Sequence, residues 1–105
     1  MQKLRNLEYL NLRRNKLTDI PATIGDLVEL EVLNVENNNL VSIPEQIGNL
    51  KFLRSFIFRF NNINSIPQSI GNLKNLEILF ASNNNIKHLS DSICNLSKLK
   101  MLHLN

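Results

Sequence analysis

Aliphatic side chains recur at fixed spacings along this chain, and the pattern of spacings repeats every 23 residues. From Leu7, apolar or Asn positions follow at spacings of three, two, three, two, three and four residues, ending at Ile24. Such self-similarity indicates a repeat protein, in which each segment folds into the same unit and stacks on its neighbours. The residues that open the pattern are Leu7, Leu30, Leu53, Leu76 and Leu99.

Within each segment, two apolar residues separated by one residue predict a short β-strand, because side chains two apart point to the same face of a strand. Segments related by translation place these strands in parallel, and the handedness rule for crossover connections predicts a right-handed coil. A helix or coiled coil is the competing interpretation, but a 23-residue period is not a multiple of the heptad. The inward pairs are Leu10/Leu12, Leu33/Val35, Phe56/Phe58, Leu79/Ala81 and Leu102/Leu104.

Asn, Pro and Gly recur in columns of their own. A buried Asn amide carries a donor and an acceptor, so it can satisfy backbone groups where the strand turns away and link neighbouring coils. Pro suits the first position of a short helical turn and holds the preceding Ile extended. In the fourth segment Ser90 replaces Pro, where we expect it to cap the helix. Cys94 replaces Gly there, which indicates that this column needs no positive backbone angle. The columns are Asn15, Asn38, Asn61 and Asn84; Pro21, Pro44 and Pro67; and Gly25, Gly48 and Gly71.

These residues match the pattern L-x-x-L-x-x-L-x-L-x-x-N-x-L-x-x-I-P-x-x-I-G-x-L, repeated four times with a partial fifth copy. The chain resembles the leucine-rich-repeat family in its 23-residue class, which includes intracellular Ras-linked scaffold proteins, related plant proteins and proteins of bacterial pathogens. The resemblance implies an α/β fold. This fold is a right-handed, horseshoe-shaped solenoid with a concave parallel β-sheet and short helical or irregular convex segments. It implies protein binding as the usual role, without identifying the partner.

We expect a single array over residues 1–105, with repeats at 4–26, 27–49, 50–72 and 73–95 and a partial repeat at 96–105. Neither end carries the polar cap that terminal repeats of a solenoid normally have. Half-exposed core side chains would forfeit roughly 5 kcal/mol of hydrophobic stabilisation at each end of the array. This is comparable with the free energy of unfolding of a small domain. We therefore expect an uncapped fragment of a longer array, or self-association through the uncapped ends.

Side chains that alternate with the inward pairs point to the concave face, where we expect a partner to bind. Exposed apolar patches commonly mark interaction sites, and arginines beside such a patch offer bidentate partners for carboxylates. The competing interpretation is that these residues simply favour strands and that the arginines solvate the surface. We expect Phe80 and Ile57 to anchor the partner and Arg59 to orient it. The candidate residues are Tyr9, Arg13, Val32, Ile57, Arg59, Phe60, Ile78, Phe80 and Met101.

Composition and charge limit the other function classes. Twelve basic residues against nine acidic ones give a net charge of +3. The charges change sign from repeat to repeat, whereas a phosphate backbone needs a continuous basic stripe, so no nucleic-acid partner is expected. Carbohydrate or lipid recognition stays open as an alternative, although aromatic platforms for sugars are scarce. A purely structural spacer within a larger protein also stays open.

No motif points to chemistry. A Ser-His-Asp arrangement, a paired-carboxylate signature and a Gly-rich phosphate loop are all missing from the sequence, so we expect neither enzyme activity nor a cofactor. His88, His103 and Cys94 lie in unrelated columns, so no metal site is expected. A single Cys excludes an internal disulfide and favours a reducing, cytoplasmic location; a secreted bacterial protein is the alternative if a signal lies outside this fragment. No apolar run approaches transmembrane length.

Overall fold

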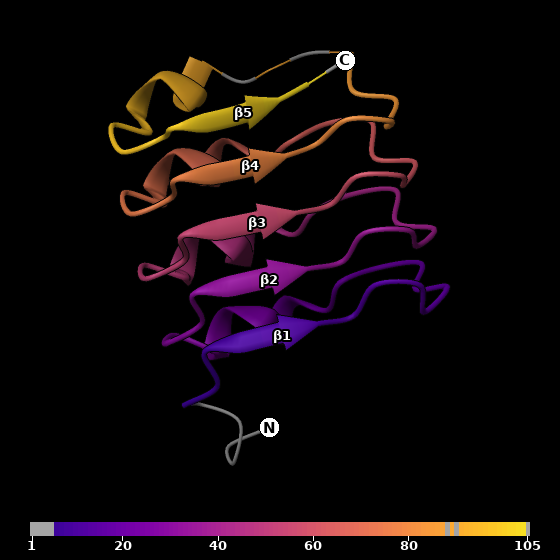
Figure 1. Ribbon diagram of the computed structural model, residues 1–105, viewed down its shortest axis with the longest axis horizontal. Coiled ribbons are helices and arrows are strands. Elements are labelled where there is room, and N and C mark those ends of the chain that lie inside the picture. Colours follow the sequence, from indigo (N-terminus) through magenta and orange to yellow (C-terminus); the bar gives the residue numbers. More distant parts are fainter. Residues whose placement is uncertain (1–5, 88, 90, 105) are drawn as a thin grey trace.

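The computed structural model describes residues 6–87, 89 and 91–104, which form a stack of coils with one short strand each (Figure 1). The strands form a five-stranded sheet in sequence order, and every neighbouring pair is parallel. Each strand residue pairs with the residue 23 positions later, as Leu10 does with Leu33. The predicted parallel sheet is thereby confirmed. The strands are β1 (Tyr9–Asn11), β2 (Val32–Asn34), β3 (Ser55–Ile57), β4 (Ile78–Phe80) and β5 (Met101–His103).

Short 3₁₀ turns form a second layer behind the sheet (Figure 1). A proline immediately precedes the first three of these turns, so the expectation that it opens the turn is wrong by one residue. Pro21 has φ −67° and ψ 152°, which is extended, and its carbonyl accepts a 3.0 Å hydrogen bond from the Ile24 amide. The extended backbone leaves the preceding Ile20 buried, as predicted. The turns are η2 (Ala22–Asp26), η3 (Glu45–Asn49), η4 (Gln68–Asn72) and η5 (Asp91–Asn95).

An aliphatic core fills the space between the two layers and runs through the stack. The inward strand positions Leu33, Phe56 and Leu79 are completely buried in the middle coils, which confirms the predicted core. Burial falls at both ends, where Leu10 is half-buried and Leu102 is 39% exposed. A coil at the end of the described stack has a neighbour on one side only, so its core side chains remain partly open.

Buried asparagines join each coil to the one before it. The Asn61 amide donates to the carbonyls of Val35 in the preceding coil and Phe58 in its own coil, both at 3.1 Å. Its Oδ1 accepts from the Leu40 amide at 3.0 Å. Asn38 and Asn84 repeat this arrangement, so the predicted role of the Asn column is confirmed there.

The glycine column permits close packing between successive 3₁₀ turns. A Cβ atom on Gly48 would lie 2.7 Å from the Cβ of Ser69 in the next coil and 2.8 Å from its carbonyl oxygen. None of the described glycines has a positive φ, in agreement with the sequence-based expectation. Cys94 belongs to the last described turn and is exposed, so its side chain meets no following coil in the described part of the chain.

The start of the first predicted repeat, at position 4, lies outside the described residues. So do His88 and Ser90, and with them the expected helix cap at Ser90. Within the described residues, no helix is long and apolar enough to cross a membrane.

Replacing Asn61 with Ala removes a buried amide that satisfies backbone groups of two coils. We expect the free energy of unfolding to fall by about 3 kcal/mol, because the Leu40 amide and the carbonyl of Val35 lose a partner. Chemical denaturation measures this change. Asn62→Ala is the matched control, since Asn62 is exposed, and it should change stability by less than about 0.5 kcal/mol. Equal effects of the two substitutions would contradict the role assigned to the amide.

Candidate functional site

The sheet face that points away from the 3₁₀ turns, here called the concave face, displays two rows of side chains. One row consists of Tyr9, Val32, Ser55, Ile78 and Met101, and the other of Asn11, Asn34, Ile57, Phe80 and His103.

The register brings most of the predicted apolar residues together. Ile57 pairs with Phe80, and Ile78 pairs with Met101, so these four form a continuous apolar patch over β3, β4 and β5. Val32 instead pairs with Tyr9 and Ser55 and meets the patch only on the diagonal. Ser55 lies between Val32 and Ile78 in this row of the sheet.

Exposure differs within this set. Ile57, Ile78 and Phe80 are half-buried. Tyr9 is 63% exposed and Met101 is 45% exposed, on the first and last strands. The concave face thus carries an exposed aromatic side chain on β1, at one end, and the apolar patch over β3, β4 and β5, at the other.

Two of the candidate arginines are held by one carboxylate. Arg59 Nη2 lies 2.6 Å from Glu36 Oε1, and Arg13 Nη2 lies 3.4 Å from Glu36 Oε2. Glu36 is only 7% exposed, whereas the two arginines keep a third or more of their side-chain surface in solvent. These two ion pairs, Arg13–Glu36 and Glu36–Arg59, are here called the ion-pair ladder. The three residues lie in one column of the sequence, 23 residues apart, and their alternating charges could have predicted the two pairs.

From Arg59, a stack of planar side chains extends across β4 to β5. The Arg59 guanidinium lies 5.1 Å from the centre of the Phe80 ring, and that ring stacks on His103 with a centre-to-centre distance of 4.4 Å. Cation–π and stacking contacts of this kind hold the rings in defined orientations. The structure therefore joins Arg59 and Phe80, which the sequence proposed separately, and adds His103, which the sequence did not propose.

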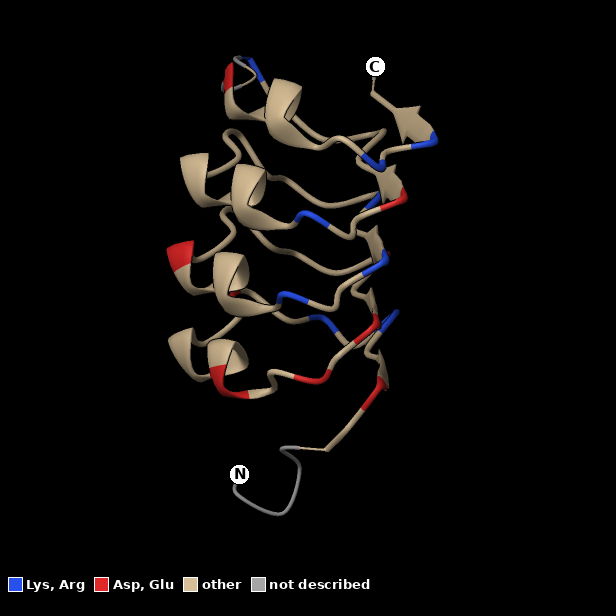
Figure 2. Cartoon of the chain, turned by 90° about the vertical axis from the view of Figure 1, so that its left-hand side faces the viewer, with Lys and Arg blue, Asp and Glu red and all other residues tan. Residues whose placement is uncertain are grey.

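A second row of charges follows the side of the sheet where the strands begin, and its sign alternates from Glu31 to Lys100 (Figure 2). Arg54 lies 3.1 Å from Glu31, and Lys100 lies 3.5 Å from Glu77. Exposed ion pairs of this kind contribute little to stability. The alternation of sign agrees with the expectation that no continuous basic stripe crosses the sheet.

Phe60 lies beyond the end of β3, next to Arg59 in the chain. Its φ is 59°, in the left-handed region, and its side chain is 47% exposed. This conformation costs an L-residue about 1–2 kcal/mol. An exposed aromatic ring thus stands at a strained position beside the arginine–glutamate cluster.

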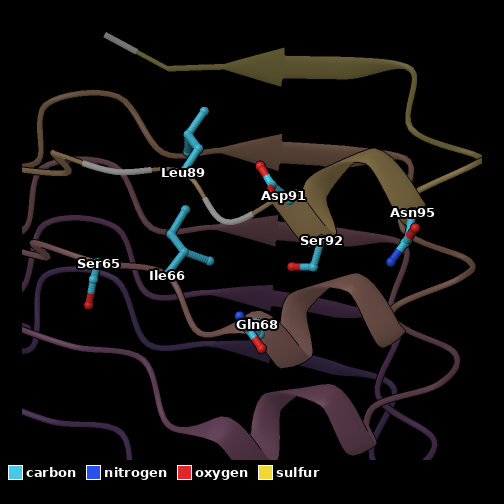
Figure 3. A pocket seen from close by; sticks show the side chains of 7 residues that line it. All are labelled: Ser65, Ile66, Gln68, Leu89, Asp91, Ser92 and Asn95. Atoms are coloured by element: carbon cyan, nitrogen blue, oxygen red, sulfur yellow. The ribbon is translucent and has the colours of Figure 1, made fainter.

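The opposite side of the molecule carries an open depression between the third and fourth coils (Figure 3). Gln68 and Ser65 contribute polar groups, and Asp91 supplies a carboxylate. No group of three or more His, Cys, Asp or Glu residues in the described part of the chain could hold a metal ion. Among the described residues, the depression therefore offers no cluster of metal ligands.

Comparison with known families assigns the repeat. Residues 45–105 match the family described as a leucine-rich repeat region, and residues 5–51 match leucine-rich repeats in two copies. The chain belongs to the leucine-rich-repeat family. No curated protein sequence matches this leucine-rich-repeat chain significantly.

Solved structures of leucine-rich-repeat proteins are similar over nearly the whole chain. A leucine-rich-repeat protein of Leptospira interrogans is 37% identical, with a TM-score of 0.94 over 98% of this chain and 27% of that one. Internalin C2 of Listeria monocytogenes is 27% identical, with a TM-score of 0.86 over 97% of this chain and 43% of that one. The plant peptide hormone receptor RGFR1, solved in complex with RGF2, is 35% identical, with a TM-score of 0.79 over 95% of this chain and 18% of that one. The present repeats thus span less than half the length of each of these proteins.

Replacing Glu36 with Ala removes the shared carboxylate and leaves two unpaired arginines, one in the coil before it and one in the coil after it. We expect the free energy of unfolding to fall by about 1–2 kcal/mol at low ionic strength, and by less in high salt. Chemical denaturation at two salt concentrations measures both values. Glu31→Ala is the control, because its ion pair with Arg54 is more exposed, and it should cost about 0.5 kcal/mol or less. A loss for Glu36→Ala no larger than the control would refute the proposed cluster.

Proposed function

We propose that this leucine-rich-repeat array binds another protein on its concave face. The observation that carries the proposal is the apolar patch of Ile57, Ile78, Phe80 and Met101, which no described element of the chain covers. Patches of this composition are common at protein interfaces. Members of the family generally mediate protein–protein interactions, and the similar plant receptor was solved with its peptide.

Polar groups around the patch support a protein partner. Arg59 lies over Phe80 and keeps about a third of its side-chain surface in solvent. Arginine is enriched at interface hot spots, and aromatic residues including Phe are enriched at protein interfaces. Tyr9 and Arg13 extend the same face over β1.

The size of the face favours a short partner segment or a larger composite surface. Strands spaced about 4.8 Å apart give this face a few hundred Å², below the roughly 800 Å² per partner of a standard interface. An array that spans 27% or 43% of its similar structures fits a role as one part of a longer binding surface.

Affinity capture with the wild-type chain and three variants tests the proposal. We expect Phe80→Ala and Arg59→Ala each to weaken capture of a specific protein by about tenfold or more, because hot-spot residues carry most of the binding energy. Phe52→Ala is the control, since Phe52 is 57% exposed in the turn between η3 and β3, away from the concave face. Circular dichroism checks that each variant is folded.

Three outcomes would overturn protein binding at this face. Capture that both concave variants leave unchanged would exclude the face. Capture that depends on added sugar or lipid would favour pattern recognition, and no specific capture at all would favour a structural spacer.

We also propose that the first coil associates with a further coil or a second copy. An apolar hollow of about 240 Å³ opens there, lined mainly by leucines and isoleucines such as Leu10, Leu12 and Leu17. The outer edge of β1 pairs with no other strand in the described residues. Open sheet edges beside an apolar surface favour pairing with another chain.

The 105-residue chain should therefore self-associate in solution. Sedimentation velocity at concentrations from about 1 to 100 μM should show a dimer or larger species that increases with concentration. Leu17→Lys should shift the population toward monomer, because it places a charge in the apolar hollow. A strict monomer for the wild type at the highest concentration would contradict this expectation.

A further inference from the structure

The residue that follows each strand exit adopts the same left-handed conformation in four successive coils. The φ angles are 60° at Arg14, 58° at Asn37, 59° at Phe60 and 60° at Asn83. Asn tolerates this region better than other residues that carry a Cβ atom. Asn37 and Asn83 therefore suit the position, whereas Arg14 and Phe60 are unfavourable choices for it.

The backbone at this position does not depend on the side chain. The Phe60 amide donates to the Ser82 carbonyl at 3.1 Å, and the Asn37 amide makes the equivalent bond to Arg59 at 3.0 Å. The Arg14 amide bonds in the same way to Glu36, also at 3.0 Å. An Asn at position 60 would keep this bond and lower the strain, so the hydrogen bonding does not require Phe.

Core packing does not require the ring either. Phe56 and Phe58, on the inward side of the same coil, are completely buried, whereas Phe60 is 47% exposed. A large apolar side chain that is both strained and exposed points to a role outside the fold, because strained residues concentrate at functional sites.

The strand exits of the first three coils carry an excess of positive charge. Arg13 and Arg59 share the single carboxylate of Glu36. Arg14 has no carboxylate within ion-pair distance in the described part of the chain. Three arginines and one glutamate leave two positive charges on the first three coils, and the exposed ring of Phe60 belongs to the third. This combination complements a ligand with carboxylates and an apolar side chain.

The spacing suggests how such a ligand lies. Arg14 and Phe60 occupy the same position two coils apart, which corresponds to about 10 Å at the strand spacing. An extended peptide covers this distance in three residues. A segment that crosses the strand exits could therefore place a carboxylate at Arg14 and an apolar side chain against Phe60.

We propose that Phe60 is a binding anchor, and that the site formed by Arg14, Glu36, Arg59 and Phe60 takes an extended acidic peptide segment of a partner protein. The inference rests on the proposed function of the concave face. It specifies the chemistry of the partner segment that lies along the strand exits, at the edge of this face. Phe60 supplies the apolar contact, and Arg14 supplies the free cation.

Phe60→Asn separates this role from a structural one. The substitution should raise the unfolding temperature by roughly 3–6 °C, because it relieves the strained conformation, and it should weaken peptide binding by about tenfold or more. Phe52→Asn is the matched control: Phe52 is more exposed, at 57%, and its φ is not positive. The control should raise neither the unfolding temperature nor the dissociation constant. A lower unfolding temperature for Phe60→Asn would overturn the inference.

A library of random 12-residue peptides displayed on phage, selected on the wild-type chain, supplies the ligands. Enriched peptides should carry Asp or Glu within about three residues of a large apolar residue, and Phe60→Asn and Arg14→Asn should each weaken their binding by about tenfold. Basic or neutral consensus sequences, no enrichment, or peptides insensitive to Phe60→Asn would overturn the inference. Peptides that Phe80→Ala weakens and Phe60→Asn does not would refute this site alone, and peptides insensitive to both would count against the concave face as a whole.

Discussion

Each coil of this protein completes the hydrogen bonding and the core of the coil next to it. The carbonyl of Val35 accepts hydrogen bonds from Asn38 in its own coil at 2.8 Å and from Asn61 in the next coil at 3.1 Å. The aliphatic side chains between the sheet and the 3₁₀ turns are likewise buried most completely where coils lie on both sides. The fold is therefore a sum of contacts between neighbours, as expected for a repeat protein.

The contacts between neighbouring coils determine the backbone, but they do not restrict the side chains on the concave face. The register repeats every 23 residues, so any column on the concave face can change without altering the buried columns. The chain uses this freedom to build an ion-pair ladder at Glu36, a stack of Arg59, Phe80 and His103, and an apolar patch beside them. The functional proposals concern only these outer columns.

Much of the fold could be predicted from the sequence because the period and the inward pairs determine which residues meet. Leu10 and Leu33 are paired, and Asn38 and Asn61 are buried, as the spacing required. The position of Pro21 was missed by one residue, because spacing alone does not locate the start of a 3₁₀ turn.

The candidate site was predictable only in part. Spacing identified the concave columns, but it did not show that Arg13 and Arg59 turn toward the same Glu36, because the direction of a long side chain depends on its neighbours. The strain at Phe60 had a readable signal, since Asn37 and Asn83 occupy the same column and Asn favours a left-handed backbone. The stack of Phe80 on His103 followed from ring orientation, which no sequence pattern specifies.

Native-state hydrogen exchange tests the dependence of each coil on its neighbours most directly. Amides in the middle of the stack, such as Leu40 and Phe58, should exchange slowest, and protection should fall stepwise toward the first and last coils, because the end coils lack one neighbour. Protection that is greatest in an end coil, or that shows no relation to position in the stack, would contradict this description.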